Sequence, residues 1–140
     1  MRPVRPYALS VVAVLAVGCN TTPVPSSSAL PIPAERVYAP EFTKAQTGFA
    51  LVVVTRDKGL KAKDCTARLF VDGTRVADMR PSEQIRLFVE EGHTIFGVSA
   101  YRCFGGGSDQ TSVSVTRAKP VLLRISVSGG KGMTIQPSPF

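Results

Sequence analysis

Eight short runs of β-branched and apolar residues, each bounded by turn-forming residues, constrain the fold of this 140-residue chain most strongly. Such runs are typical of β-strands, and no window shows the 3.6-residue period of an amphipathic helix. One helical turn is expected, over residues 33–38. The sequence therefore predicts an all-β fold, an antiparallel β-sandwich or open barrel of about seven to eight short strands. The expected strands cover residues 49–55, 66–71, 74–79, 84–89, 93–101, 110–117, 121–127 and 133–136.

The connections between these strands predict the direction in which each strand runs. Asp72-Gly73 is a strong two-residue hairpin signal, and we take every other connection to reverse the chain as well. Four connections then meet at one end of the domain, which we name the upper end: 56–65, 80–83, 102–109 and 128–132. The opposite, lower end holds the connections 72–73, 90–92 and 118–120.

Two of the three cysteines fall within the predicted strand region. Cys65 begins a strand that leaves the upper end, and Cys103 follows a strand that arrives there, so both lie at the same end. An even pair of this kind in an exported protein is typical of a structural disulfide. We expect Cys65 and Cys103 to be bonded; a redox-active pair is the alternative, but there is no Cys-x-x-Cys spacing.

Residues 1–18 have the pattern of a secretory signal peptide, with a short basic front before an apolar run. The ten residues of this run, 8–17, span about 15 Å, half of the roughly 30 Å bilayer core, so the run is too short for a transmembrane helix. Its end, Leu15-Ala16-Val17-Gly18-Cys19, resembles a bacterial lipobox. The resemblance implies cleavage before Cys19, acylation of that cysteine and, because Asn20 follows, transport to the outer membrane. An ordinary leader with a chance cysteine is the alternative.

Residues 19–34 are expected to form the lipidated cysteine and a tether. Residues 20–33 contain four prolines, three serines, two threonines and no charge. This composition favours an extended chain that buries no face, either as a spacer or as an unstructured remnant. We expect the tether to join the β-sandwich domain, residues 35–140, at the lower end just before Phe49. The upper-end loops would then point away from the membrane.

Three short motifs follow one another in this domain: Leu69-Phe70-Val71-Asp72-Gly73, Val76-Ala77 and Glu91-Gly92-His93-Thr94-Ile95. They give a strand, a tight turn, a second strand and a Gly-His entry to a third. This arrangement resembles the PEGA-type domain and related uncharacterised domains of bacterial envelope lipoproteins, over about residues 65–101. The resemblance implies a small β-sandwich and supplies no catalytic residue.

Composition and motifs argue against several functions. A formal charge of +7 is moderately basic and falls short of a nucleic-acid-binding signature by itself. One histidine and three cysteines leave little material for a metal site, and we expect no metal and no cofactor. We interpret His93 as a solvated turn residue and Gly105-Gly106-Gly107 as a flexible loop, because phosphate-binding loops precede a helix. No nucleophile elbow, zinc motif or paired-carboxylate pattern is visible, so we expect no enzymatic activity.

The upper-end loops carry the candidate binding surface. They hold seven basic residues (Arg56, Lys58, Lys61, Lys63, Arg80, Arg102 and Lys131) and four acidic residues (Asp57, Asp64, Glu83 and Asp109). Tyr101 and Phe104 flank Arg102 and could add an apolar contact. A solvated rim that only maintains solubility is the alternative. We expect an envelope protein or an anionic envelope polymer to contact Lys58, Lys61, Lys63, Arg102 and Phe104.

Together these features predict an outer-membrane lipoprotein, facing the periplasm, that acts as a non-enzymatic interaction or accessory module of the cell envelope. Two alternatives stay open. One is a lipid-anchored inhibitor of a secreted hydrolase, and the other is a module that binds a glycan or a lipid.

Overall fold

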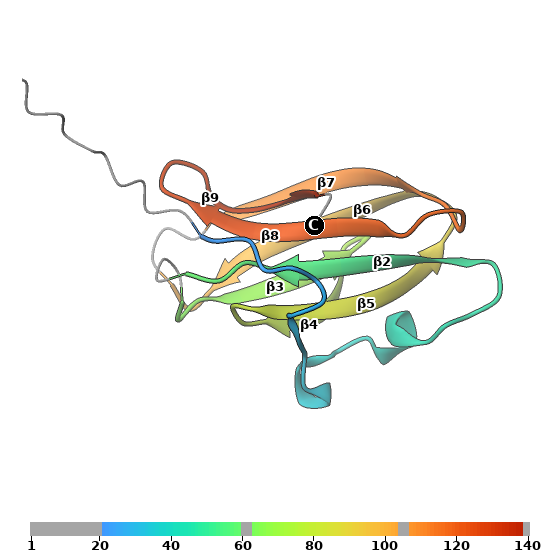
Figure 1. Ribbon diagram of the computed structural model, residues 1–140, viewed down its shortest axis with the longest axis horizontal. Coiled ribbons are helices and arrows are strands. Elements are labelled where there is room, and N and C mark those ends of the chain that lie inside the picture. The colour runs from blue at the N-terminus through green and yellow to red at the C-terminus, as the bar shows by residue number, and fades with distance from the viewer. Residues whose placement is uncertain (1–20, 60–62, 104–106, 139–140) are drawn as a thin grey trace, which may run out of the picture.

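The computed structural model describes residues 21–59, 63–103 and 107–138. Within these ranges the chain forms nine strands and two short 3-10 helices, with the strands in two sheets that pack face to face (Figure 1). The predicted all-β sandwich is therefore confirmed. The elements are β1 Leu30–Pro31, η1 Ala34–Arg36, η2 Pro40–Thr43, β2 Phe49–Arg56, β3 Thr66–Val71, β4 Thr74–Met79, β5 Glu83–Glu90, β6 Gly92–Tyr101, β7 Ser108–Val115, β8 Val121–Ser128 and β9 Gly132–Pro137.

The two sheets differ in size and in strand direction. One sheet has the order β1-β5-β2-β8-β9, and the other has the order β4-β3-β6-β7. Every pair in the four-stranded sheet is antiparallel, whereas β1–β5 and β2–β8 in the five-stranded sheet are parallel. Both β2 and β8 run toward the upper end, so placing them side by side necessarily makes a parallel pair.

The core lies between the sheets and follows the alternation of the sequence. On β5, Ile85, Leu87 and Val89 are buried, while Arg86 is exposed on the opposite face. β2 is buried on both faces, as its continuous apolar run predicts, and Val53 is only 6% exposed although it lies outside the core cluster. The outer face of β2 must therefore be covered by another part of the chain.

That cover is the leading segment, residues 21–39, whose first part, up to residue 34, the sequence predicted to be an extended tether. Val24 is 7% exposed, and the Oγ of Ser26 lies 3.4 Å from the Oγ1 of Thr55 on the outer face of β2. Figure 1 shows this blue segment running across the ends of β8 and β2. The expectation that the segment buries no face was wrong, because its backbone and hydroxyl groups pair with the sandwich and one valine is covered.

The leading segment also covers one edge strand of each sheet, β5 and β4. β1 pairs in parallel with the start of β5, and the backbone N–H of Tyr38 donates to the carbonyl of Val76 on β4, 2.8 Å away. Between them, η1 forms where a helical turn was expected, and Arg36 forms an ion pair with Glu83. Unpaired strand edges invite association with other chains, so this covering protects the molecule against edge-to-edge aggregation.

The connections lie at the two ends of the sandwich as predicted from the reversal of the chain at each connection. β2, β4, β6 and β8 end at the upper end, where β3, β5, β7 and β9 begin. At the lower end Asp72 and Gly73 have φ angles of 45° and 82°, the left-handed conformation that a two-residue type I′ hairpin requires. Asn, Asp and Gly adopt this conformation most readily, which explains the signal in the sequence.

Candidate functional site

The upper end is held together by the predicted disulfide. Cys65 and Cys103 are bonded, with their Cα atoms 5.1 Å apart, and Cys65 is buried. The bond joins the start of β3 to the residues that follow β6, two neighbouring strands of the four-stranded sheet. It therefore fixes the base of two upper-end loops relative to each other.

Arg56, counted among the basic loop residues in the sequence, is instead buried at the end of β2. It is 2% exposed, and its Nη1 donates to the carbonyl oxygens of Cys65 at 2.7 Å and Met79 at 2.5 Å. Desolvation lowers the pKa of Arg56 to about 10, and the nearby charge of Glu83 only partly offsets this. Arg56 thus connects the two sheets at the upper end and is not available to a partner.

Asp57, the next residue, anchors the beginning of the leading segment. Its carboxylate is buried and accepts from Arg124 Nε, which is 2.8 Å from both oxygens, and from Thr21 Oγ1 at 3.2 Å. The pKa of Asp57 is raised by burial, with Arg124 and Thr21 acting in the opposite direction. Sequence reasoning missed this cluster, because Arg124 lies 67 positions from Asp57 and no local pattern links them.

The start of the leading segment therefore lies at the upper end. The N–H of Thr21 donates to the carbonyl of Val127 at 3.1 Å, and Thr22 forms a two-bond antiparallel bridge with Lys58. The sequence predicted that the chain approaches the sandwich at the lower end, near Phe49. That prediction was wrong, because it took the segment before Phe49 to be an unattached spacer and ignored its pairing with β8 and with the chain after β2.

The basic rim of the upper end consists of five exposed residues: Lys58, Lys63, Arg80, Arg102 and Lys131. Three of the four acidic residues counted there are engaged inward, Asp57 with Arg124, Glu83 with Arg36, and Asp109 with the N–H of Ile135. Asp64 is the remaining exposed carboxylate in the described part of these connections. The surface is therefore more strongly positive than the residue count suggests. Lys61 and Phe104, also predicted for this surface, lie outside the described residues.

Tyr101 lies beside the basic rim at the end of β6. Its side chain is 36% exposed, the highest level of exposure among the large apolar residues on β6 after Ile95. The guanidinium of Arg68 lies 3.4 Å from the centre of its ring, and that of Arg102 lies 5.3 Å away. Arg102 and then Arg68 lower the pKa of Tyr101. Two guanidinium groups thus contact an exposed aromatic ring at the upper end.

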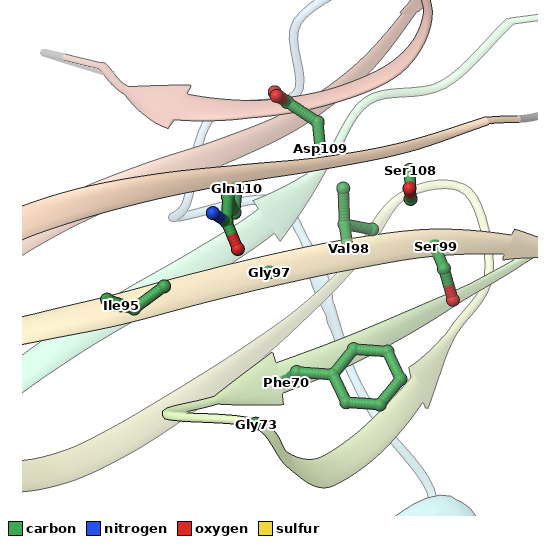
Figure 2. Close-up of a pocket in the computed structure, with 9 residues that line it drawn as sticks. All are labelled: Phe70, Gly73, Ile95, Gly97, Val98, Ser99, Ser108, Asp109 and Gln110. Atoms are coloured by element: carbon green, nitrogen blue, oxygen red, sulfur yellow. The ribbon is translucent and has the colours of Figure 1, made fainter.

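A second surface feature is a shallow hollow of about 430 Å³ on the outer face of the four-stranded sheet (Figure 2). Its centre is Gly97, where a Cβ atom would lie 3.6 Å from the Cβ of Phe70 on the neighbouring strand. Ile95 and Gln110 line it from β6 and β7, and Ile95 is 46% exposed. The hollow therefore combines apolar side chains with hydroxyl and amide groups on a sheet face that glycine leaves open.

The described residues hold neither a cluster of metal-ligand side chains nor a helix that could cross a membrane. Residues 21–59, 63–103 and 107–138 contain no group of three or more His, Cys, Asp or Glu side chains placed to hold a metal ion. No helix in these same ranges is long and apolar enough to cross a membrane. His93 is exposed at the start of β6.

No protein-family model, curated protein or solved structure matches the chain. The resemblance to PEGA-type domains therefore stays a prediction from the motifs of β3, β4 and β6.

Proposed function

We propose that the protein is a lipid-anchored, non-enzymatic interaction module of the bacterial cell envelope, attached to the outer membrane through Cys19. The observation that carries this proposal is the lipobox-like sequence Leu15-Ala16-Val17-Gly18-Cys19 at the end of a short apolar run. Several acyl chains anchor a protein durably where one does not, since each buried CH₂ contributes about 0.8 kcal/mol.

The placement of the three cysteines supports export from the cytoplasm. The Cys65–Cys103 disulfide is typical of an oxidising compartment. The remaining cysteine, Cys19, is the one that the lipobox pattern assigns to acylation. Covered edges and a compact core suit a module that presents its surfaces to envelope components, either a protein or an anionic polymer.

Metabolic labelling tests the anchor directly. Cells that express the chain are grown with a clickable fatty acid, and the wild type is compared with Cys19→Ala. We expect the label on the wild type alone, together with a mature N-terminus at residue 19. Equal labelling of both proteins would refute acylation at Cys19.

Crosslinking in cells followed by affinity purification tests the interaction role. We expect one envelope protein to co-purify in stoichiometric amounts with the wild type. Recovery of a secreted hydrolase in an inactive complex would instead support the inhibitor alternative.

The hollow around Gly97 favours a second candidate function, binding of a glycan. Sugars present apolar C–H faces beside hydroxyl groups, and Phe70, Ile95 and Gln110 offer the matching surfaces. Titration with soluble peptidoglycan fragments, followed by NMR, would shift the amides of β6 and β7 around Gly97 if this function holds. Unchanged spectra at millimolar glycan would exclude it.

A further inference from the structure

The position of Thr21 fixes which end of the sandwich an anchor at Cys19 would approach. Cys19 precedes Thr21 by two residues, and two extended residues span at most about 7 Å. Thr21 is bonded to Asp57 and Val127 at the upper end. A lipid on Cys19 would therefore lie close to the upper end, on the same side as the basic rim.

Lys58 is the basic-rim residue whose backbone separation from Cys19 can be bounded. It pairs through two backbone hydrogen bonds with Thr22, which is three residues from Cys19 and hence within about 11 Å of it. The polar headgroup layer on each side of a bilayer is itself about 5–7 Å thick. Lys58, which is exposed, would consequently lie close enough to the headgroup layer for lipid phosphates to act on its charge, because the Debye length is roughly 8 Å at physiological ionic strength.

The upper end is more positively charged than the lower end, as an orientation with the upper end toward an anionic membrane requires. The basic rim has five exposed cations, with Asp64 as the exposed carboxylate among the described residues there. The lower end has the exposed carboxylates of Asp72, Glu90 and Glu91 against the cations of Arg117 and Lys119. An anionic surface would therefore attract the upper end and leave the lower end in solution.

Tyr101 adds a second observation that points to the same surface. Tyrosine is enriched where membrane proteins meet the headgroup layer, because its ring is apolar and its hydroxyl is polar. Here the ring is exposed at the upper end and is contacted by Arg68 and Arg102. An aromatic ring beside guanidinium groups is suited to a layer in which acyl chains give way to phosphates.

We propose that the upper end is the membrane-facing end, and that Lys58, Lys63, Arg102 and Lys131 bind the anionic headgroups of the bilayer that holds the lipid anchor. This inference rests on the proposed acylation of Cys19. It reverses the orientation expected from the sequence, since the lower end and the hollow around Gly97, not the basic rim, become the surfaces open to other envelope components.

Amine labelling of the acylated protein in vesicles tests the orientation with native lysines. The purified full chain is reconstituted into phosphatidylcholine vesicles with or without one-third phosphatidylglycerol, pulsed with an acetylating reagent, and mapped by mass spectrometry. We expect labelling of Lys58, Lys63 and Lys131 to slow about fivefold in the anionic vesicles, the equivalent of the about 1 kcal/mol that a basic residue contributes near such a surface. Lys119 at the lower end and Lys44 should label equally in both.

Salt and charge neutralisation sharpen the test. In 1 M salt, where the Debye length is about 3 Å, the protection should disappear. The double variant Lys58→Gln/Lys131→Gln should lose protection at Lys63, whereas the matched control Lys44→Gln/Lys119→Gln should keep it. Circular dichroism and the Cys65–Cys103 bond verify that both variants are folded.

The outcomes separate this inference from the proposed function. If the protein does not float with vesicles, Cys19 carries no lipid and both proposals fail. If it floats but upper and lower lysines are labelled equally in anionic vesicles, the anchor stands and the membrane-facing orientation is overturned. Protection confined to Lys119 and Lys44 would mean that the molecule is oriented the other way.

Discussion

The upper and lower ends of the sandwich are built from different kinds of interaction. The lower end has short turns, among them the Asp72-Gly73 hairpin, and its ion pair between Glu91 and Arg117 is exposed. The upper end has the longer connections, and buried groups from distant parts of the chain hold it together. Local residue preferences are sufficient to form the turns of the lower end, whereas the structure of the upper end depends on tertiary contacts.

This difference predicts where substitutions cost stability. A buried polar group that loses its partner carries the full desolvation penalty, whereas an exposed ion pair contributes little because water replaces it. Substitutions at the upper end should therefore be several times more destabilising than comparable ones at the lower end. Substitutions at four places test this contrast between the two ends.

The disulfide should have the largest effect. Replacing both Cys65 and Cys103 by serine opens a loop whose ends are 38 positions apart, and the chain-entropy model gives a loss of roughly 4 kcal/mol in the free energy of unfolding. Denaturant unfolding of the variant measures this loss, and reduction of the wild type provides an independent value. An unfolding midpoint equal to that of the oxidised wild type would show that the disulfide does not stabilise the upper end.

Arg56→Met should rank second. The variant keeps the length of the side chain but deletes the donors to the carbonyls of Cys65 and Met79, at a cost of about 3 kcal/mol. Arg86→Met, an exposed position on the same sheet, is the matched control and should change stability by less than about 0.5 kcal/mol. Equal effects of the two substitutions would show that the buried guanidinium does not stabilise the upper end.

Thr21→Val tests the attachment of the leading segment. It removes the hydroxyl that donates to Asp57 and accepts from the N–H of Val127 at 3.0 Å, a loss of about 1 kcal/mol. Hydrogen exchange at the Thr22 amide should accelerate about fivefold, while the Leu30 amide, bonded to the carbonyl of Ser82, should be unaffected. The control Thr22→Val alters an exposed side chain and should leave exchange at position 22 unchanged.

Glu91→Gln should have the smallest effect. The N–H of Arg117 and then the charge of Arg117 lower the pKa of Glu91, so the folded state favours the carboxylate. Its contribution is present above the ordinary carboxyl pKa and is lost as pH falls through the folded pKa. We expect a slightly lower thermal midpoint at neutral pH and none of this difference once Glu91 is protonated. Glu90→Gln, a substitution at the neighbouring exposed carboxylate, is the matched control and should leave the thermal midpoint at neutral pH unchanged.

The same contrast explains what the sequence could predict. Seven of the eight expected strands agree with the structure to within one residue at each end, and the strand over 110–117 is shifted by two, because period-two alternation and turn residues are local signals. The cysteine pairing followed from strand direction together with the even pair of cysteines expected in an exported protein. The buried roles of Arg56 and Asp57 did not, because a charged residue after a strand reads as solvated unless its distant partners are known.

The leading segment was the largest miss, for a related reason. Proline-, serine- and threonine-rich sequence has no periodic apolar face, so nothing in residues 20–33 marks them as part of a fold. The segment is attached through backbone groups, which every extended chain offers, and through one buried valine and the hydroxyl of Thr21. None of these groups forms a recognisable sequence pattern. The sequence signal for this attachment lies instead in β2. Val53 is apolar and lies on the outer face of β2, so another part of the chain has to cover it.

The way this segment is attached gives the molecule a graded mechanical response. A pull on the N-terminus loads the Thr21 contacts and the Thr22–Lys58 bridge first, β1 second and the Tyr38 contact with β4 last. Contacts loaded in series yield one after another at low force, whereas the strands of the sandwich resist together. Release of residues 21–29 alone would add about 30 Å of extended chain. Under tension applied at the N-terminus, the segment would therefore lengthen before the core of the sandwich is strained.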